Sequence, residues 1–293
     1  MRITNQIIDR RALEAIQKSV SGLEESHAQV ASGTRLRSAA DDPAGYVGVM
    51  SADRRLAALV QYRRNVSAAE ARLGAEEAAL DQVTDLLARA RELAISQAAS
   101  NGTTATRLIA KAEVDQLLAE VVKLGNTKQG NSWLFGGDFS DTAPFTPAGA
   151  VNPARPPVGG GSVEIGEGQT VALNHDGQRV FLDTGVFAAL QQLSDALGAD
   201  DTPGVAASIT SVVSAFDAVQ DVLGETGARV RQLETASANI ESLELTLRTQ
   251  RSDLADIDIE EAISKLASRQ TAYEAALLAT ARLNSLSLTD YLR

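Results

Sequence analysis

Two histidines, His27 and His175, are the residues through which this chain could most readily do acid–base or metal chemistry. A zinc site on a helix needs two histidines one turn apart, and nucleophilic catalysis needs a histidine beside an acid and a nucleophile. His27 stands among the apolar positions of a helical pattern, so we expect it to be packed or at the rim of a helix seam. His175 lies in Asn-His-Asp-Gly, whose residue types are those of a tight turn, and no nucleophilic serine motif accompanies it. Neither histidine predicts a catalytic or metal site.

Two further motifs could bind ions, but each has a simpler structural interpretation. The stretch GGGSVEIGEG is glycine-rich but lacks the Gly-Lys-Ser or Gly-Lys-Thr of a phosphate loop, so it predicts turns. The acidic residues between 253 and 261 do not have the spacing of a calcium loop, and they suit the positively charged start of a helix. Since the chain also has no cysteine, it has no thiolate nucleophile and no cysteine-ligated zinc. We expect no catalytic residue, no metal and no cofactor.

The composition favours long helices and excludes some partners. Of the 293 residues, 44% are hydrophobic but only 4% are aromatic, which is typical of alanine- and leucine-rich helices packed along narrow seams. The net charge of -11 argues against a nucleic-acid partner, because phosphate binding needs clustered Lys and Arg. The N-terminus lacks the apolar run of a secretory signal, and no stretch approaches the roughly 18 apolar residues of a membrane span.

Helical periodicity dominates the first part of the chain. Apolar residues at Leu13, Ile16, Val20 and Leu23 alternate steps of three and four, which predicts a coiled-coil seam. We expect this helix to end near residue 32, before Gly33. A second helix should start with Asp42 as its N-cap and Pro43 at its first position, and continue to about residue 98. A third is expected over about 104–124, with Thr103 or Thr104 as its cap.

The middle of the chain predicts a small β insert, with turns at Gly166–Gly168 and at Asn-His-Asp-Gly. Helix should return after a cap at Thr184. A further helix should run from about 203 to 223 and break at Gly-Glu-Thr-Gly. After the break comes a clean heptad, and Asp258 should cap a final helix. The seam residues of the two long rod helices are Leu56, Leu59, Val66, Leu73, Leu80, Val83 and Leu87, with Leu233, Ile240, Leu247 and Leu254.

The predicted fold is mainly α with a small β insert: long antiparallel coiled-coil helices from both chain ends flank a central β subdomain. We divide the chain into an N-terminal coil helix (1–40), N-terminal rod helices (41–130), the β insert (131–185), C-terminal rod helices (186–255) and a C-terminal coil helix (256–293).

The stretch ASGTRLRSAADDPAG, residues 31–45, closely resembles the N-terminal signature of the bacterial flagellin family. The likeness continues through AALDQVTDLLARARELAISQAASNGT and returns at the C-terminus in GARVRQLETASANIES and in RSDLADIDIEEAISKLASRQTAYEAALLATARLNSLSLTDYLR. It covers both helical arms, about two-thirds of the chain. The end of the chain is most similar to the members of the family that join the hook to the filament.

This resemblance implies a structural, non-enzymatic flagellar protein exported through the flagellar type III apparatus. Its implied partners are further copies in a ring, hook-associated protein 1, flagellin and an export chaperone. The subunit-interface candidates are Arg35, Arg37, Asp41 and Asp42 of the connector, with Leu13, Ile16, Val20, Leu23, Leu266, Tyr273 and Leu277 of the terminal helices. The family's contact with a vertebrate innate receptor implies a further face at Arg89, Leu93 and Glu113.

Two alternatives remain open at this point. The chain could be a compact filament flagellin, in which case it should polymerise alone. The β insert could instead display a glycan-binding or hydrolytic module, which a screen against polysaccharides would detect.

Overall fold

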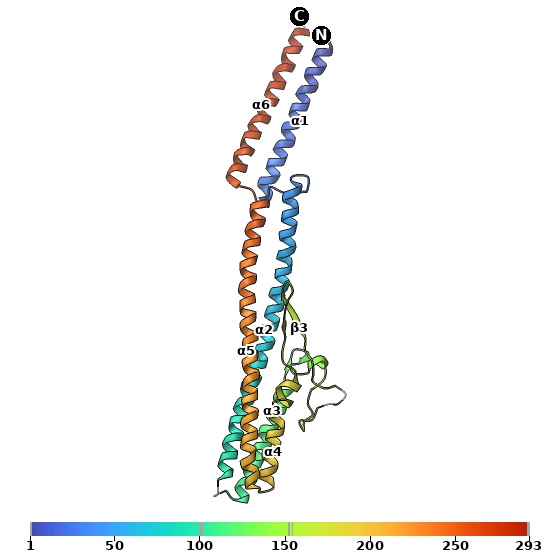
Figure 1. Cartoon of the computed structure of the whole chain (residues 1–293). Helices are drawn as coiled ribbons and strands as arrows, with labels where there is room; N and C mark the ends of the chain where they lie inside the picture. The colour runs from blue at the N-terminus through green and yellow to red at the C-terminus, as the bar shows by residue number, and fades with distance from the viewer. Residues whose placement is uncertain (1, 100–101, 152, 154, 292–293) are drawn as a thin grey trace. The chain divides into compact units, whose positions relative to one another are not determined.

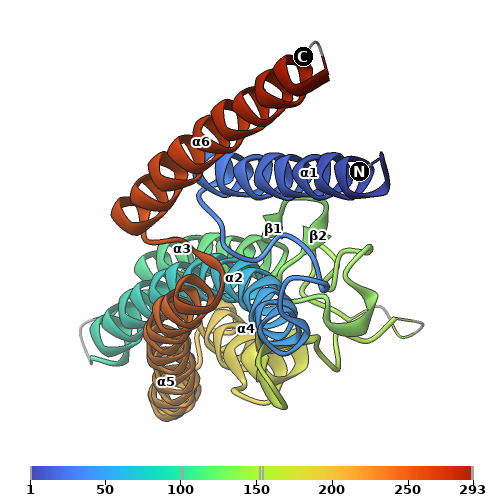
Figure 2. The same cartoon turned by 90° about the horizontal axis from the view of Figure 1, so that it is seen from above.

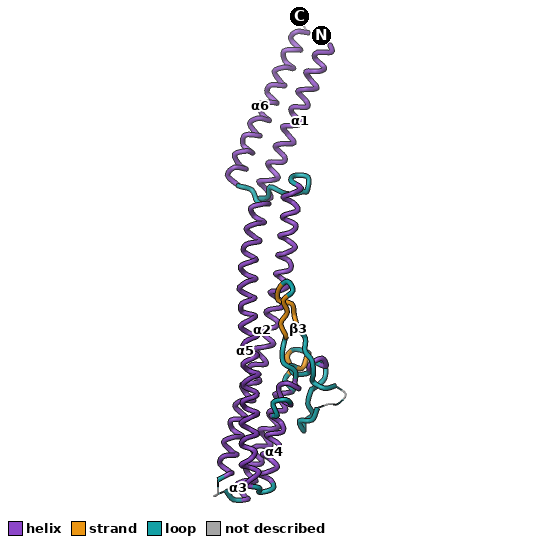
Figure 3. Tube along the Cα trace, in the orientation of Figure 1, coloured by secondary structure: helices purple, strands orange, loops and turns teal. Residues whose placement is uncertain are grey.

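The computed structural model describes residues 2–99, 102–151, 153 and 155–291, with the side chains of residues 7 and 10–282 within those ranges. Met1, Leu292 and Arg293 of the predicted terminal segments lie outside the described residues. Most of the described chain is helical, and its named strands form two short hairpins (Figure 3). The predicted class, mainly α with a small β insert, is confirmed. The chain forms two compact units, residues 1–57 with 243–293, and residues 58–242.

In the first unit, helices α1 (Arg2–Ser32) and α6 (Ile259–Tyr291) run antiparallel side by side (Figure 1). Arg269 of α6 donates hydrogen bonds to the carbonyl oxygen of Gly22 and to Glu25, 3.1 Å away, and so ties the two helices together. The unit also contains the start of α2 (Pro43–Ala98) and the end of α5 (Thr202–Ala255), where Arg251 pairs with Asp53 at 2.8 Å.

The connector between α1 and α2 follows the predicted chemistry. Gly33 ends α1 in the left-handed conformation at φ +69°, which glycine adopts without the strain a side chain would cause. Asp42 accepts a hydrogen bond from the Gly45 amide at 3.0 Å, so it caps α2 as expected. Gly45 is also needed for space, because a Cβ there would lie 2.9 Å from Leu36 Cδ1.

Residues 33–36 pair with the connector between α5 and α6. Thr34 forms an antiparallel bridge with Asp256, and the Ile257 amide donates to the Gly33 carbonyl at 3.1 Å. Asp258 then caps α6, because its carboxylate accepts from the Glu260 amide at 3.0 Å.

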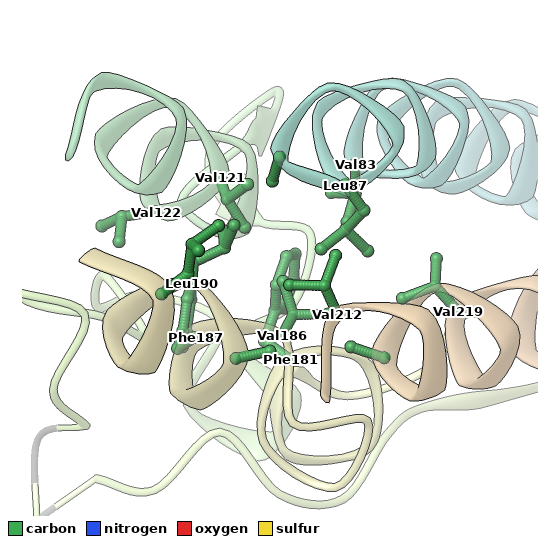
Figure 4. Close-up of a cluster of buried hydrophobic side chains, with 14 of the residues drawn as sticks. Val83, Leu87, Val121, Val122, Phe181, Val186, Phe187, Leu190, Val212 and Val219 are labelled. Carbon is green, nitrogen blue, oxygen red and sulfur yellow. The ribbon is translucent and has the colours of Figure 1, made fainter. Parts of the chain in front are cut away.

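The second unit is a bundle of α3 (Thr104–Gly125), α4 (Val186–Gly198) and the adjoining parts of α2 and α5, seen end-on in Figure 2. Its core contains valine and leucine side chains from all four helices, together with aromatic rings from the insert (Figure 4). Phe181 packs edge-on against Phe135 and Phe145 at centroid distances of 5.1 and 5.4 Å. Although aromatics are few in the chain, they gather where the insert joins the helices.

The insert contains β1 (Lys128–Gln129), β2 (Ser132–Trp133), β3 (Ser162–Gly166) and β4 (Gln169–Ala172), with short turns of helix η1 (Gly137–Phe139) and η2 (Gln178–Leu182). β1 pairs with β2, and β3 pairs antiparallel with β4 across the predicted turn at Gly166–Gly168. The second predicted turn is wrong. Asn174 and His175 are buried, and the chain continues into η2 rather than into another strand.

Two helix boundaries also differ from the prediction. Thr103 caps α3 through a capping box, as the sequence indicates, but Thr184 does not cap α4. The N-cap is Gly185, and the Thr184 hydroxyl donates instead to the Val180 carbonyl at 2.6 Å. The break at Gly-Glu-Thr-Gly is absent, since α5 is continuous over Thr202–Ala255. A glycine costs a helix about 1 kcal/mol relative to alanine, and burial of neighbours such as Val222 outweighs that cost.

Candidate functional site

The paired terminal helices, α1 and α6, expose large apolar side chains. Leu13 is 58% exposed and Leu277 is 41% exposed, and both are predicted subunit-interface residues. The other predicted interface residues of this pair are half-buried: Ile16, Val20, Leu23, Leu266 and Tyr273. One chain therefore covers only part of its own apolar stripes, and surfaces of this kind mark sites of protein association.

Sequence reasoning missed other exposed apolar residues of α6. Ile263 is 53% exposed and Leu278 is 63% exposed. The available signal was their apolar type, but neither is among the residues that the sequence analysis assigns to the interface. The apolar surface of α6 is therefore wider than one coiled-coil stripe.

The charged connector is partly used within the chain. Arg35 donates to the Leu254 carbonyl at 2.8 Å and lies 3.7 Å from Asp42. The Asp41 carboxylate accepts from the amides of Arg37 and Ser38 at 3.0 and 2.9 Å, and these two bonds lower the pKa of Asp41.

The Arg37 side chain is exposed, and no bond of its guanidinium is found among the described residues. Of the four predicted connector charges, Arg37 is thus the one most available to another subunit.

The predicted rod-seam residues are mostly buried. Leu56 and Leu254 are half-buried, and the others are buried: Leu59, Val66, Leu73, Leu80, Val83, Leu87, Leu233, Ile240 and Leu247. In the first unit, α2 and α5 leave a groove of about 410 Å³ lined by residues that include Ala52, Leu247 and Leu254. These helices therefore use their seams mainly inside the chain.

The residues that the resemblance assigns to an innate receptor lie together on α2 and α3. Arg89 pairs with Glu113 at 2.7 Å, and this hydrogen bond raises the pKa of Arg89. Leu93 is only 9% exposed and packs in the bundle core. Arg89 and Glu113 are therefore accessible, whereas Leu93 is largely occupied within the chain.

His175 sits in a polar cluster, which we call the histidine cluster: His175, Glu76, Glu225, Thr226 and Arg179. His175, Glu76 and Thr226 are buried, whereas Glu225 and Arg179 are exposed. The Nδ1 of His175 lies 2.5 Å from Glu76 of α2, and its Nε2 lies 2.9 Å from Glu225 of α5. Thr226 donates to the same Glu76 carboxylate at 3.1 Å, and Arg179 donates to Glu225 at 2.9 Å. The sequence held no local signal for this cluster, because its members come from three distant segments.

The His175 ring is 5% exposed and faces two carboxylates, and the Thr226 hydroxyl lies 3.5 Å from its Nδ1. No group of three or more His, Cys, Asp or Glu residues suited to a metal ion occurs in the part of the chain that the structure describes. His27, the other histidine, is exposed beside Leu23, Glu24 and Gln270.

Among the described residues, one helix is long and apolar enough by composition to cross a membrane. It is α5, with a mean hydropathy of 1.2 over its most apolar window. Its residues Val205, Val212 and Val219 are buried in the bundle core, and the core helix of a soluble protein passes the same test. The absence of a membrane span stays a prediction.

Two family models match the chain at its two ends. The bacterial flagellin N-terminal helical region matches residues 3–137, and the bacterial flagellin C-terminal helical region matches residues 209–292. Together they cover about three-quarters of the sequence, with the N-terminal region before the C-terminal region. The chain belongs to the bacterial flagellin family. It is a structural component of the bacterial flagellum.

Full-length relatives in the flagellin family include proteins of different kinds. The chain is 24% identical to flagellar hook-associated protein 3 of Escherichia coli K12 over 98% of both chains. It is 27% identical to flagellar filament core protein flaB2 of Brachyspira hyodysenteriae over 98% of this chain and 97% of that one. The solved flagellar junction protein FlgL of Legionella pneumophila shares the fold at a TM-score of 0.60, with 16% identity, 71% of this chain and 100% of that chain covered.

Proposed function

We propose that this chain is the protein that joins the flagellar hook to the filament, and that the exposed apolar faces of α1 and α6 pack against neighbouring subunits. The observation that carries the proposal is the incomplete burial of the terminal helices. Leu13, Ile263 and Leu278 each leave more than half of their surface in water in a single chain. Burial of apolar surface is the dominant favourable term in most protein association, so these faces favour assembly.

The junction role is favoured over the filament role by the relatives and by the end of the chain. A filament core protein also aligns from end to end, but hook-associated protein 3 does so from two bacteria, and a solved junction protein shares the fold. The C-terminal residues of this chain also resemble the junction members of the family. The partners follow from this role: further copies in a ring, hook-associated protein 1 on one side, and flagellin on the other. Export through the flagellar type III apparatus, with a dedicated chaperone, completes the proposal, in which the chain catalyses no reaction.

Immunogold electron microscopy of intact flagella tests this role. Antibodies against the insert should label one short zone at the distal end of the hook. Label along the whole filament would instead identify a filament flagellin, and absence of label from the flagellum would overturn both roles. Purified protein gives a second readout, since a filament flagellin should polymerise alone into long filaments and a junction protein should not.

The connector offers a finer test of subunit contact. Arg37→Glu should reduce swimming while changing the melting temperature of the monomer little, because the exposed Arg37 guanidinium has no hydrogen bond or ion pair among the described residues and only a weak electrostatic interaction with Asp41. Arg37→Lys is the matched control, since it keeps the charge and should swim normally. Arg35→Glu should in addition lower monomer stability, because Arg35 bonds to Leu254 and approaches Asp42. Normal swimming of the Arg37→Glu strain would remove this residue from the interface.

A further inference from the structure

The histidine cluster joins three parts of the second unit. His175 belongs to the insert, Glu76 to α2, and Glu225 to α5. Each ring nitrogen lies within hydrogen-bond distance of a different carboxylate, at 2.5 and 2.9 Å. The backbone amide of His175 also donates to Glu76, at 3.0 Å. One side chain of the insert therefore fastens it to both long helices.

When both glutamates are ionised, this geometry favours a doubly protonated ring. A neutral imidazole has one N–H and one lone pair, so it can donate to only one of the two carboxylates. The lone pair of the other nitrogen would then face a carboxylate oxygen at hydrogen-bond distance, which is repulsive. An imidazolium donates from both nitrogens and satisfies both Glu76 and Glu225.

Charges on the surrounding elements do not replace the imidazolium at Glu76. On α2, Arg72 lies one turn before Glu76 and interacts with it electrostatically, but its hydrogen bonds go to Asn174, Ser132 and carbonyl groups of the insert. On η2, Arg179 bonds to Glu225 rather than to Glu76. Glu76 has no exposed surface, and its other hydrogen-bond donors, the His175 amide and Thr226, are uncharged. Loss of the imidazolium charge would leave this buried carboxylate without a bonded cation.

We propose that His175 is a proton-dependent clamp that fastens the insert to α2 and α5 when its imidazole carries two protons and both glutamates are ionised. Raising the pH removes one ring proton, breaks one of the two bonds and loosens residues 174–182. Lowering the pH far enough protonates the carboxylates and also opens the clamp. The attachment of the insert should therefore be strongest at an intermediate pH.

On the acid side, the Glu225 half of the clamp persists below the usual range for a glutamate. Burial acts to raise the pKa of Glu225, but the hydrogen bonds from Arg179 and His175 outweigh it and hold the pKa below its ordinary value. Other contacts keep the rest of the insert in place when the clamp opens. Arg72 donates to the Leu134 carbonyl at 3.2 Å, and Asn65 donates to the Glu164 carbonyl of β3 at 2.7 Å. We therefore expect local loosening rather than unfolding of the bundle.

Hydrogen–deuterium exchange of the full chain between pH 6 and 9 tests the clamp, with rates corrected for the intrinsic pH dependence of exchange. Because one linked proton changes an opening equilibrium by up to tenfold per pH unit, protection of residues 174–182 should fall by about tenfold or more across this range. Helix α3 should show no comparable change. His175→Gln should give weak, pH-independent protection. The matched control is His27→Gln, which replaces the exposed histidine of the first unit and should behave as wild type.

A second measurement does not depend on a His175 variant folding. In His27→Gln, the ring nitrogen signals of labelled histidine come from His175 alone, since the chain has two histidines. They should report a doubly protonated ring at pH 6 that loses one proton as protection falls. A ring that is neutral at pH 6, or protection of residues 174–182 that does not change with pH in the wild type, would overturn the clamp.

Discussion

Replacing Leu13 with glutamine should separate assembly from folding. Fully burying a leucine side chain contributes about 1.5–3 kcal/mol. Leu13 is 58% exposed in the single chain, so roughly 1–2 kcal/mol of that free energy remains to be gained when another subunit covers it. Since 1.4 kcal/mol is a factor of ten, Leu13→Gln should weaken each subunit contact by about 5- to 30-fold. Glutamine has nearly the helix propensity of leucine, so α1 should persist.

The assay is binding of purified protein to isolated hooks by co-sedimentation, alongside thermal unfolding of the monomer. Leu233→Ala is the matched control, because Leu233 has no exposed surface. It should cost about 2–5 kcal/mol of unfolding free energy and lower the melting temperature by several degrees. Below its melting temperature it should still bind hooks. If Leu13→Gln binds hooks as well as wild type does, or destabilises the monomer as much as Leu233→Ala, the assignment of α1 to the subunit interface is refuted.

Three further predictions concern single side chains. Backbone hydrogen bonds lower the pKa of Asp41 from 3.8, so the stability that this carboxylate contributes should be complete above pH 3.8 and should fade as the pH falls through the lowered pKa. The melting temperature of Asp41→Asn should therefore approach that of wild type only in acid. Arg72→Ala should expose the insert to proteases, and Arg72→Lys should not restore protection, because an ammonium cannot reproduce the guanidinium fork that bonds Asn174 and the Leu134 carbonyl. Leu93→Ala should lower the melting temperature, because Leu93 is buried in the bundle core. Arg89→Ala should change it little, since an exposed ion pair contributes at most about 1 kcal/mol. Equal melting temperatures of the two variants would contradict the burial of Leu93.

Local sequence chemistry predicted the ends of the helices well where one or two residues decide the geometry. Gly33 adopts the positive φ expected of a helix end, Asp42 and Thr103 cap the helices that follow them, and Gly166–Gly168 turns a hairpin. Each of these outcomes depends on contacts within a few residues, so the sequence carries the information directly.

The errors arose where packing at long range outweighed local preference. Gly224 and Gly227 indicate a break, but burial of Val222 and Leu233 keeps α5 helical through them. The histidine cluster is a stronger case, because Glu76 and Glu225 lie 99 and 50 residues from His175 along the chain. No spacing pattern connects such residues before the fold is known.

Deletion of the gene from its bacterium tests the central claim most directly. Electron microscopy of the deletion strain should show hooks without filaments, with flagellin free in the culture medium, and a plasmid copy of the gene should restore filaments. Normal filaments in the deletion strain would contradict the role of this chain as the junction between hook and filament.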